Sequence, residues 1–249
     1  MKNTVLKDAD IREPLFDFLE ESYGKVRIIE EKTMGSSRAD VVMVTEDALY
    51  GLEIKSDADS YTRLEGQVKD YDKYYDYNIA VVGTSHAMHI REHVPSYWGV
   101  ITVEYVDNEF DFYILRKPER NPKLSPERKL QILWRPELAH IQELNLMPKY
   151  KDKSKDYVIK KIIERTKLPD DRKGRIDISK LNIQISEVLF ERDYNTVEET
   201  LKEYRKGEIQ KKLEAETDPQ KKLELMVEQA AKGRLITQKS FKKRRRRKR

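Results

Sequence analysis

Two short apolar segments separated by a polar pair constrain the fold of this chain more than any other feature. Residues 39–45 and 49–55 are rich in Val, Ile, Leu and Tyr, and Glu46-Asp47 lies between them. β-Branched and aromatic residues favour strands, and two such segments joined by a polar turn predict a hairpin. A turn centred on Glu46-Asp47 places Asp40 directly opposite Glu53 in antiparallel pairing.

These facing carboxylates predict a cation site. Like charges opposite each other destabilise a sheet, and charges inside apolar strands are costly unless paired. A hard divalent ion removes both costs, so we expect Mg²⁺ (or Mn²⁺) held by Asp40, Glu53 and the main-chain carbonyl of Ile54. Lys55 points to the same face as Glu53 and would orient a water or offset charge on a phosphate. The alternative is a solvated hairpin in which Glu53 and Lys55 are surface residues.

The segment before the hairpin predicts an amphipathic helix. Apolar residues recur at helical spacing through 10–22, and Asp8 or Asp10 is expected as the N-cap. Pro14 is expected within the first turn, where a missing N–H is tolerated. Gly24 is expected to end the helix.

The order of the remaining segments predicts an α/β fold. A second helix is expected at 60–77, and the apolar stretch 78–83 is typical of a strand buried on both faces. Further strands are expected at 26–30, 100–106 and 110–115. The order helix, three strands, helix, strand predicts a mixed sheet with helices on both faces.

Composition divides the chain into four parts. Residues 1–117 hold the predicted sheet, and the proline-rich segment 118–126 is the expected linker. Residues 127–240 have the pattern of a mostly α-helical accessory region, and 241–249 form a basic tail. The helices of this half are expected at 126–146, 155–167, 179–192, 196–215 and 219–232.

Charge is distributed unevenly along the chain. Residues 1–115 carry 12 Lys and Arg against 23 Asp and Glu, whereas residues 116–249 carry 38 against 22. The basic half suits a polyanion, and its last eight residues would bind nucleic-acid phosphates without reading sequence. These eight are Lys242, Lys243, Arg244, Arg245, Arg246, Arg247, Lys248 and Arg249.

The composition also excludes several classes of protein. No apolar run approaches the roughly 18 to 20 residues that cross a membrane, and the first residues lack the apolar stretch of a signal peptide. Because the chain has no Cys, disulfides, thiolate zinc sites and Cys nucleophiles are excluded. We therefore expect a soluble cytoplasmic protein, nuclear only in a eukaryotic host. Its four His residues match no zinc motif.

The pattern of Asp40 followed by Glu53-Ile54-Lys55 resembles the PD-(D/E)xK phosphodiesterase superfamily, which includes restriction endonucleases and RecB-type nuclease domains. The resemblance covers roughly residues 8–115 and extends to a bacterial and phage branch of the superfamily. Ala39 stands where the family pattern has Pro. The resemblance implies a restriction-endonuclease-like mixed sheet flanked by helices, with Asp40, Glu53 and Lys55 as catalytic residues.

Further positions extend the resemblance. Glu13, or more weakly Glu20, resembles an acidic residue on the first helix that approaches the metal, although it also suits a helix first turn. Gln67 and Tyr71 resemble a Q-x-x-x-Y pattern whose residues share a helical face. The resemblance implies that Gln67 is a further catalytic residue, its amide holding DNA or the catalytic groups, and that Tyr71 contacts nucleic acid. Arg63 resembles a phosphate contact. The structural alternative is that Asp59 caps the second helix and pairs with Arg63.

The sequence therefore predicts a metal-dependent nuclease that hydrolyses DNA, which is favoured over RNA, through metal-activated water. One alternative is a noncatalytic nucleic-acid-binding protein that retains the fold. Another is an interaction scaffold built on the charged helices of residues 196–232. A homodimer is left open.

Overall fold

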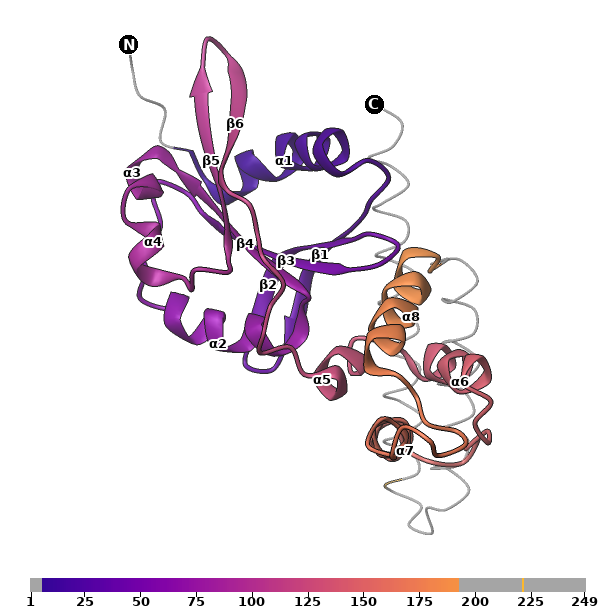
Figure 1. Cartoon of the computed structure of the whole chain (residues 1–249). Helices are drawn as coiled ribbons and strands as arrows, with labels where there is room; N and C mark the ends of the chain where they lie inside the picture. The colour runs from indigo at the N-terminus through magenta and orange to yellow at the C-terminus, as the bar shows by residue number, and fades with distance from the viewer. Residues whose placement is uncertain (1–5, 193–220, 222–249) are drawn as a thin grey trace, which may run out of the picture. The chain divides into compact units, whose positions relative to one another are not determined.

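The computed structural model describes residues 6–192 and Lys221, and the fold is a mixed sheet covered by helices (Figure 1). The helices predicted at 196–215 and 219–232, apart from Lys221, and the basic tail at 241–249 lie outside the described residues. None of the described helices is both long and apolar enough to span a bilayer.

Six strands form one sheet in which each strand lies beside its neighbour in sequence. The pairs β1–β2, β2–β3 and β5–β6 are antiparallel, whereas β3–β4 and β4–β5 are parallel. The predicted mixed sheet is confirmed, and β4 is buried along nearly its whole length as expected. The strands are β1 Arg27–Met34, β2 Ser37–Val44, β3 Leu49–Lys55, β4 Tyr77–Gly83, β5 Gly99–Val106 and β6 Glu109–Arg116.

The β2–β3 hairpin has the predicted register. Val41 pairs with Leu52, and Val44 pairs with Leu49. The turn closes where the N–H of Thr45 donates to the carbonyl of Ala48 at 3.0 Å. Asp40 and Glu53 therefore face each other one step beyond the last paired residues.

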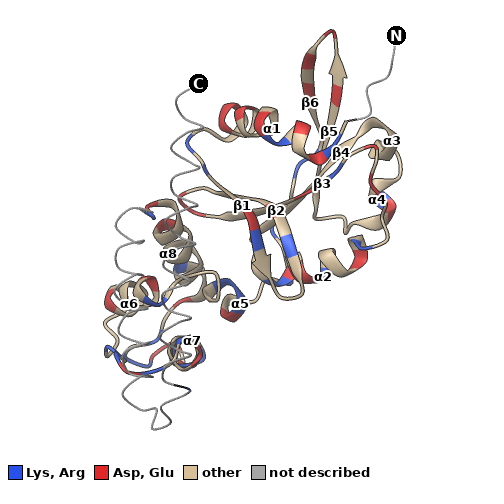
Figure 2. Cartoon of the chain, turned by 180° about the vertical axis from the view of Figure 1, so that it is seen from behind, with Lys and Arg blue, Asp and Glu red and all other residues tan. Residues whose placement is uncertain are grey.

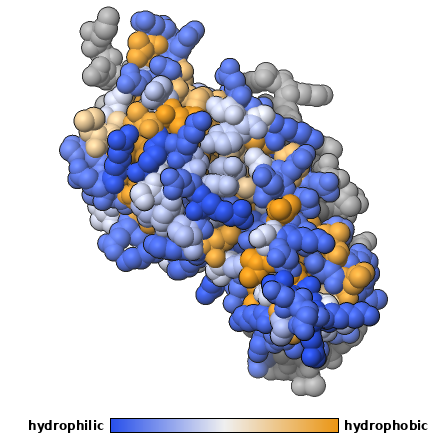
Figure 3. All heavy atoms as spheres, viewed as in Figure 1, coloured by the Kyte–Doolittle hydropathy of each residue, from blue (hydrophilic) through white to orange (hydrophobic). Residues whose placement is uncertain are grey.

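Helices cover both faces of the sheet (Figure 1). On one face, α1 (Asp8–Tyr23) buries Ile11, Leu15 and Leu19 against apolar residues of β2 to β5. On the other face, α2 (Leu64–Tyr74) packs its aromatic side, including Tyr71, against the sheet. The surface in Figure 3 is mostly hydrophilic with scattered apolar patches, because the larger apolar side chains lie in these two layers.

The start of α1 differs from the prediction. The N-cap is Lys7, whose N–H donates to Asp10 Oδ2 at 3.0 Å, so neither Asp8 nor Asp10 is the cap. Pro14 consequently lies inside the helix and removes one main-chain hydrogen bond. The helix continues because apolar residues on both sides of the proline are buried against the sheet. Gly24 follows its last residue, as predicted.

The second helix is shorter than the predicted 60–77. Residues 56–63 form turns in which Asp59 Oδ2 accepts hydrogen bonds from the N–H and hydroxyl of Ser56, at 2.9 and 2.6 Å. Arg63 is the N-cap residue, without a side-chain cap. Asp59 therefore stabilises the preceding turn and does not cap the helix.

The described helices of the second half are α5 (Pro126–Leu130), α6 (Arg135–Leu144), α7 (Lys155–Thr166) and α8 (Ile178–Phe190). The predicted helix 126–146 is interrupted before Arg135 because Pro136, in the first turn of α6, cannot continue a preceding helix. Two short helices, α3 (Thr84–Ala87) and α4 (Ile90–His93), lie between β4 and β5.

The segment 118–126 has no helix or strand before Pro126, but it is held against the sheet domain. Asn121 is buried, and its amide donates to the main-chain carbonyls of Asp72 and Tyr75, both at 2.8 Å. Fully buried Lys129 of α5 lies 2.6 Å from Asp76. The described residues 6–191 accordingly belong to one compact unit.

Candidate functional site

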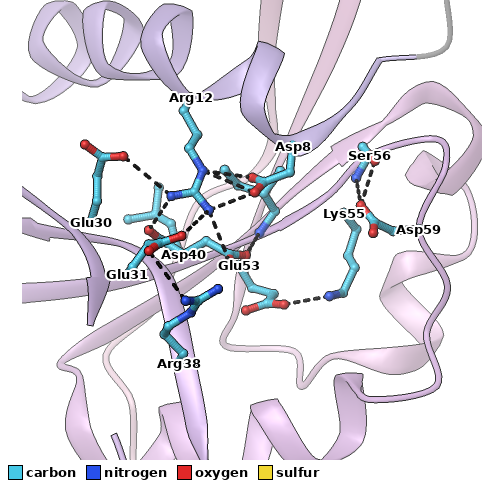
Figure 4. Close-up of polar contacts among 12 residues, drawn as sticks. Asp8, Arg12, Glu30, Glu31, Arg38, Asp40, Glu53, Lys55, Ser56 and Asp59 are labelled. Atoms are coloured by element: carbon cyan, nitrogen blue, oxygen red, sulfur yellow. Dashed lines mark hydrogen bonds and ion pairs between the residues drawn. The ribbon is translucent and has the colours of Figure 1, made fainter. Parts of the chain in front are cut away.

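A cavity of about 950 Å³ opens beside the end of β3, between the start of α1, the β1–β2 turn and the start of α2. Asp40, Glu53, Lys55 and Gln67, all predicted site residues, line this one cavity. Figure 4 shows the first three with Arg12 and Asp8 of α1. Segments well separated in sequence therefore place their polar side chains around one hollow.

Glu53 accepts hydrogen bonds from three side chains although it is only 1% exposed. Oε1 accepts from Lys55 Nζ at 2.6 Å and from the amide of Gln67 at 2.5 Å. Oε2 accepts from the hydroxyl of Tyr71 at 2.7 Å. Hydrogen bonds that stabilise the charged carboxylate compensate for its burial.

Asp40 has a different environment. Oδ2 accepts the main-chain N–H of Ile54 at 2.9 Å, across the hairpin. Burial, and then the charge of Glu53, raise the pKa of Asp40 to about 7, and the hydrogen bond from Ile54 only partly opposes this. The two carboxylates therefore face each other, as predicted from the hairpin, with Lys55 beside Glu53 and Arg12 beside Asp40.

Lys55 and Gln67 belong to the same hydrogen-bonded group. Lys55 is 5% exposed, and Nζ also donates to Gln67 Oε1 at 3.3 Å. Glu53 and Lys55 share a face because they are two residues apart on β3. Gln67 reaches them from the first turn of α2.

Tyr71 lies behind the cavity, which corrects its predicted contact with nucleic acid. The side chain is fully buried, and its hydroxyl donates to the carbonyl of Leu52 at 3.0 Å as well as to Glu53. A Cβ at Gly51 would collide first with the ring of Tyr75 and then with the ring of Tyr71, which would lie 2.7 Å away. The absence of a side chain at Gly51 thus lets Tyr71 approach the sheet and support Glu53.

The first helix contributes residues other than the predicted Glu13. Glu13 and Glu20 are exposed on α1, and neither lines the cavity. Asp8 and Arg12, four residues apart on one face, line it instead. The prediction that Glu13 approaches the site was wrong. Which face of α1 points toward the cavity depends on how Ile11 packs on the sheet.

The turns after β3 place two charged residues, Asp59 and Arg63, at the cavity. Arg63 is exposed and lines it, so a phosphate contact is sterically open. Asp59 also lines the cavity, but Ser56 holds its carboxylate. Asp57 faces away and accepts from the N–H and hydroxyl of Ser85 at 3.0 and 2.6 Å.

The β1–β2 turn forms a wall that sequence patterns did not indicate. Ser36 and Ser37 line the cavity and donate hydroxyl hydrogen bonds to Asp70 of α2, at 2.8 and 2.7 Å. Gly35 has a φ of 56° and passes close to the same carboxylate. The Gly-Ser-Ser sequence signals a turn, but nothing in it identifies Asp70 as the partner.

The donor set fits one ion of the magnesium type. Among the residues that the structure describes, no group of three or more His, Asp or Glu is arranged to hold a metal. Asp40 and Glu53 offer two carboxylates facing one cavity, and Mg²⁺ commonly uses one or two carboxylates together with water and phosphate oxygens. Burial, and then the charge of Glu53, raise the pKa of Asp40, and a cation beside both acids would oppose both effects.

Fold and site together define an α/β protein in which paired carboxylates, a lysine and an amide line one cavity at the end of a central strand. Figure 2 shows that acidic residues are prominent on α1. The family model of bacteriophage P4 protein cII matches residues 1–199, so the chain belongs to that family. No curated protein and no solved structure matches the chain.

Proposed function

We propose that this protein is a metal-dependent nuclease of the PD-(D/E)xK type that hydrolyses phosphodiester bonds in DNA. The observation that carries the proposal is the convergence of Asp40, Glu53, Lys55 and Gln67 on one cavity, with Glu53 bonded directly to Lys55 and Gln67. These are the residues that the resemblance marks as catalytic.

Asp40, Glu53 and the carbonyl of Ile54 would hold Mg²⁺ or Mn²⁺. Such an ion, when bound, lowers the pKa of a coordinated water and offsets charge on a phosphodiester.

Lys55 supplies the fixed positive charge of the site. Its ammonium is held between Glu53 and Gln67 at 2.6 and 3.3 Å, so it enters the cavity with little rotational freedom. An ammonium has three donors, and one would remain to orient a water or contact a phosphate oxygen. Arg63, which is exposed and lines the cavity, would bind the neighbouring phosphate.

DNA is the proposed partner, and the basic residues of the C-terminal half would supply non-specific affinity. The charge of the sequence supports this, since residues 116–249 carry 38 Lys and Arg against 22 Asp and Glu. Binding through phosphates would weaken steeply with salt. We also propose a cytoplasmic location, which the absence of Cys supports.

The direct test is cleavage of single-stranded, nicked and branched DNA by the full-length protein with Mg²⁺ or Mn²⁺. Lys55→Met and Glu53→Gln should each reduce the rate by about 100-fold or more. Asp47→Asn, at the opposite end of the same hairpin and exposed, is the matched control and should cut normally. Failure to cut any substrate, or equal cleavage by the site variants, would contradict the proposal.

A noncatalytic nucleic-acid-binding protein is the second candidate. It is favoured by the finding that no group of three or more His, Asp or Glu among the described residues is arranged to hold a metal. Calorimetry distinguishes the two candidates: undiminished DNA binding without detectable Mn²⁺ binding at millimolar concentration supports this one.

A further inference from the structure

Arg12 is the centre of a second charge cluster on the α1 side of the cavity. Its guanidinium lies 2.7 Å from Asp8, 3.7 Å from Asp40, 3.5 Å from Glu30 and 3.9 Å from Glu31. Figure 4 shows these four acids around one arginine. The cluster draws on α1, β1 and β2, so three elements direct acidic side chains at one positive group.

The arginine is well fixed in this place. Its side chain is 13% exposed, and two of its nitrogens donate to the carboxylate of Asp8. A third contact runs from Nη1 to the main-chain carbonyl of Asp40 at 3.4 Å. A guanidinium stays charged at every physiological pH, so the cluster has a permanent cation.

Asp40 separates this arginine from the proposed metal position. Oδ1 faces Arg12, while the same carboxylate also faces Glu53 across the hairpin. Two-ion phosphodiesterases place a second ion about 4 Å from the first, bridged by a shared carboxylate. In this chain a guanidinium nitrogen contacts both Asp40 and Asp8, which are the acids that a second ion would need.

We propose that Arg12 is a built-in cation that replaces a second metal ion, so that the site binds one divalent ion. This inference rests on the proposed function, because it assumes an ion at Asp40 and Glu53. It predicts that removal of the arginine charge exposes Asp8 and Asp40 as ligands for an additional ion.

The test counts Mn²⁺ ions on the full-length protein by calorimetry and by the electron paramagnetic resonance of free Mn²⁺. Only ions lost in an Asp40→Asn variant are counted. We expect one such ion for the wild type and for Arg12→Lys, which keeps the charge. We expect two for Arg12→Gln, with the first bound about tenfold more tightly because a neighbouring like charge is removed.

A second variant identifies the ligand of the additional ion. Adding Asp8→Asn to Arg12→Gln should return the count to one. Two such ions on the wild type would overturn the inference while leaving the proposed function intact, and this result requires only that the Asp40→Asn variant used for the count is folded. One ion on a folded Arg12→Gln protein would also overturn it. No ion on the wild type would overturn the proposed function itself, and the inference with it.

Discussion

Asp70 holds the β1–β2 turn, which forms one wall of the cavity, through hydrogen bonds. Its replacement by Asn tests that role quantitatively. Oδ2 accepts the N–H and hydroxyl of Ser36 at 3.2 and 2.8 Å and the hydroxyl of Ser37 at 2.7 Å. Lys73 lies 3.1 Å from Oδ1. Burial alone would raise the pKa of Asp70, but the bonds from Ser37, Ser36 and Lys73 outweigh it and lower the pKa to about 2.

The magnitude follows from the pKa. A change from the ordinary 3.8 to about 2 favours the charged folded form by roughly 2 kcal/mol. Because the folded pKa lies below the unfolded one, this stability is present above about pH 4 and is lost as the pH falls toward 2. We expect Asp70→Asn to lower the free energy of unfolding by about 2 kcal/mol at pH 7 and by about half as much at pH 3.

Urea unfolding followed by tryptophan fluorescence at pH 7, 4 and 3 measures this difference. Asp171→Asn is the control, because Asp171 is exposed, and it should change stability by less than about 0.5 kcal/mol. A loss for Asp70→Asn that is the same at pH 7 and pH 3, or below about 0.5 kcal/mol at pH 7, would refute the reasoning.

Three further substitutions test buried contacts by urea unfolding, the first two of them behind the site and the third between α5 and Asp76. Gly51→Ala should cost about 1–3 kcal/mol because its methyl would collide with the rings of Tyr75 and Tyr71, and an unchanged midpoint would contradict that packing. Tyr71→Phe should cost about 2 kcal/mol because it removes a hydrogen bond to buried Glu53; wild-type stability would show that water replaces the hydroxyl. Lys129→Met should cost about 3–5 kcal/mol by leaving Asp76 buried without its partner, and a gain in stability would mean that the ion pair is dispensable.

Local patterns predicted the hairpin and much of the sheet. Glu46-Asp47 between two apolar segments was sufficient to predict the register that pairs Val41 with Leu52, because strand pairing on either side of a short turn is determined by the turn. The same register brought Asp40 and Glu53 to one face. Those residues, with Lys55, were therefore accessible to reasoning from sequence alone.

Helix boundaries and helix faces were less predictable. Pro14 suggested a later start for α1, but burial of Ile11 and Leu15 outweighs the hydrogen bond that the proline lacks. Glu13 and Glu20 were the predicted acids of this helix, and Asp8 was expected only as an N-cap, because a helix has several polar positions and only its packing shows which of them face a neighbour.

The sequence by itself determined the alternation of strands and helices, the pairing of two acids across a hairpin, and the uneven distribution of charge, because each depends on residues close together in the chain. Tertiary structure alone decided that Tyr71 supports Glu53 from behind, that Asp70 holds the β1–β2 turn, and that Arg12 lies among four acids. These contacts join segments that are distant in sequence. Which residues meet in these contacts depends on how the helices pack on the sheet, and no local sequence pattern predicts that packing.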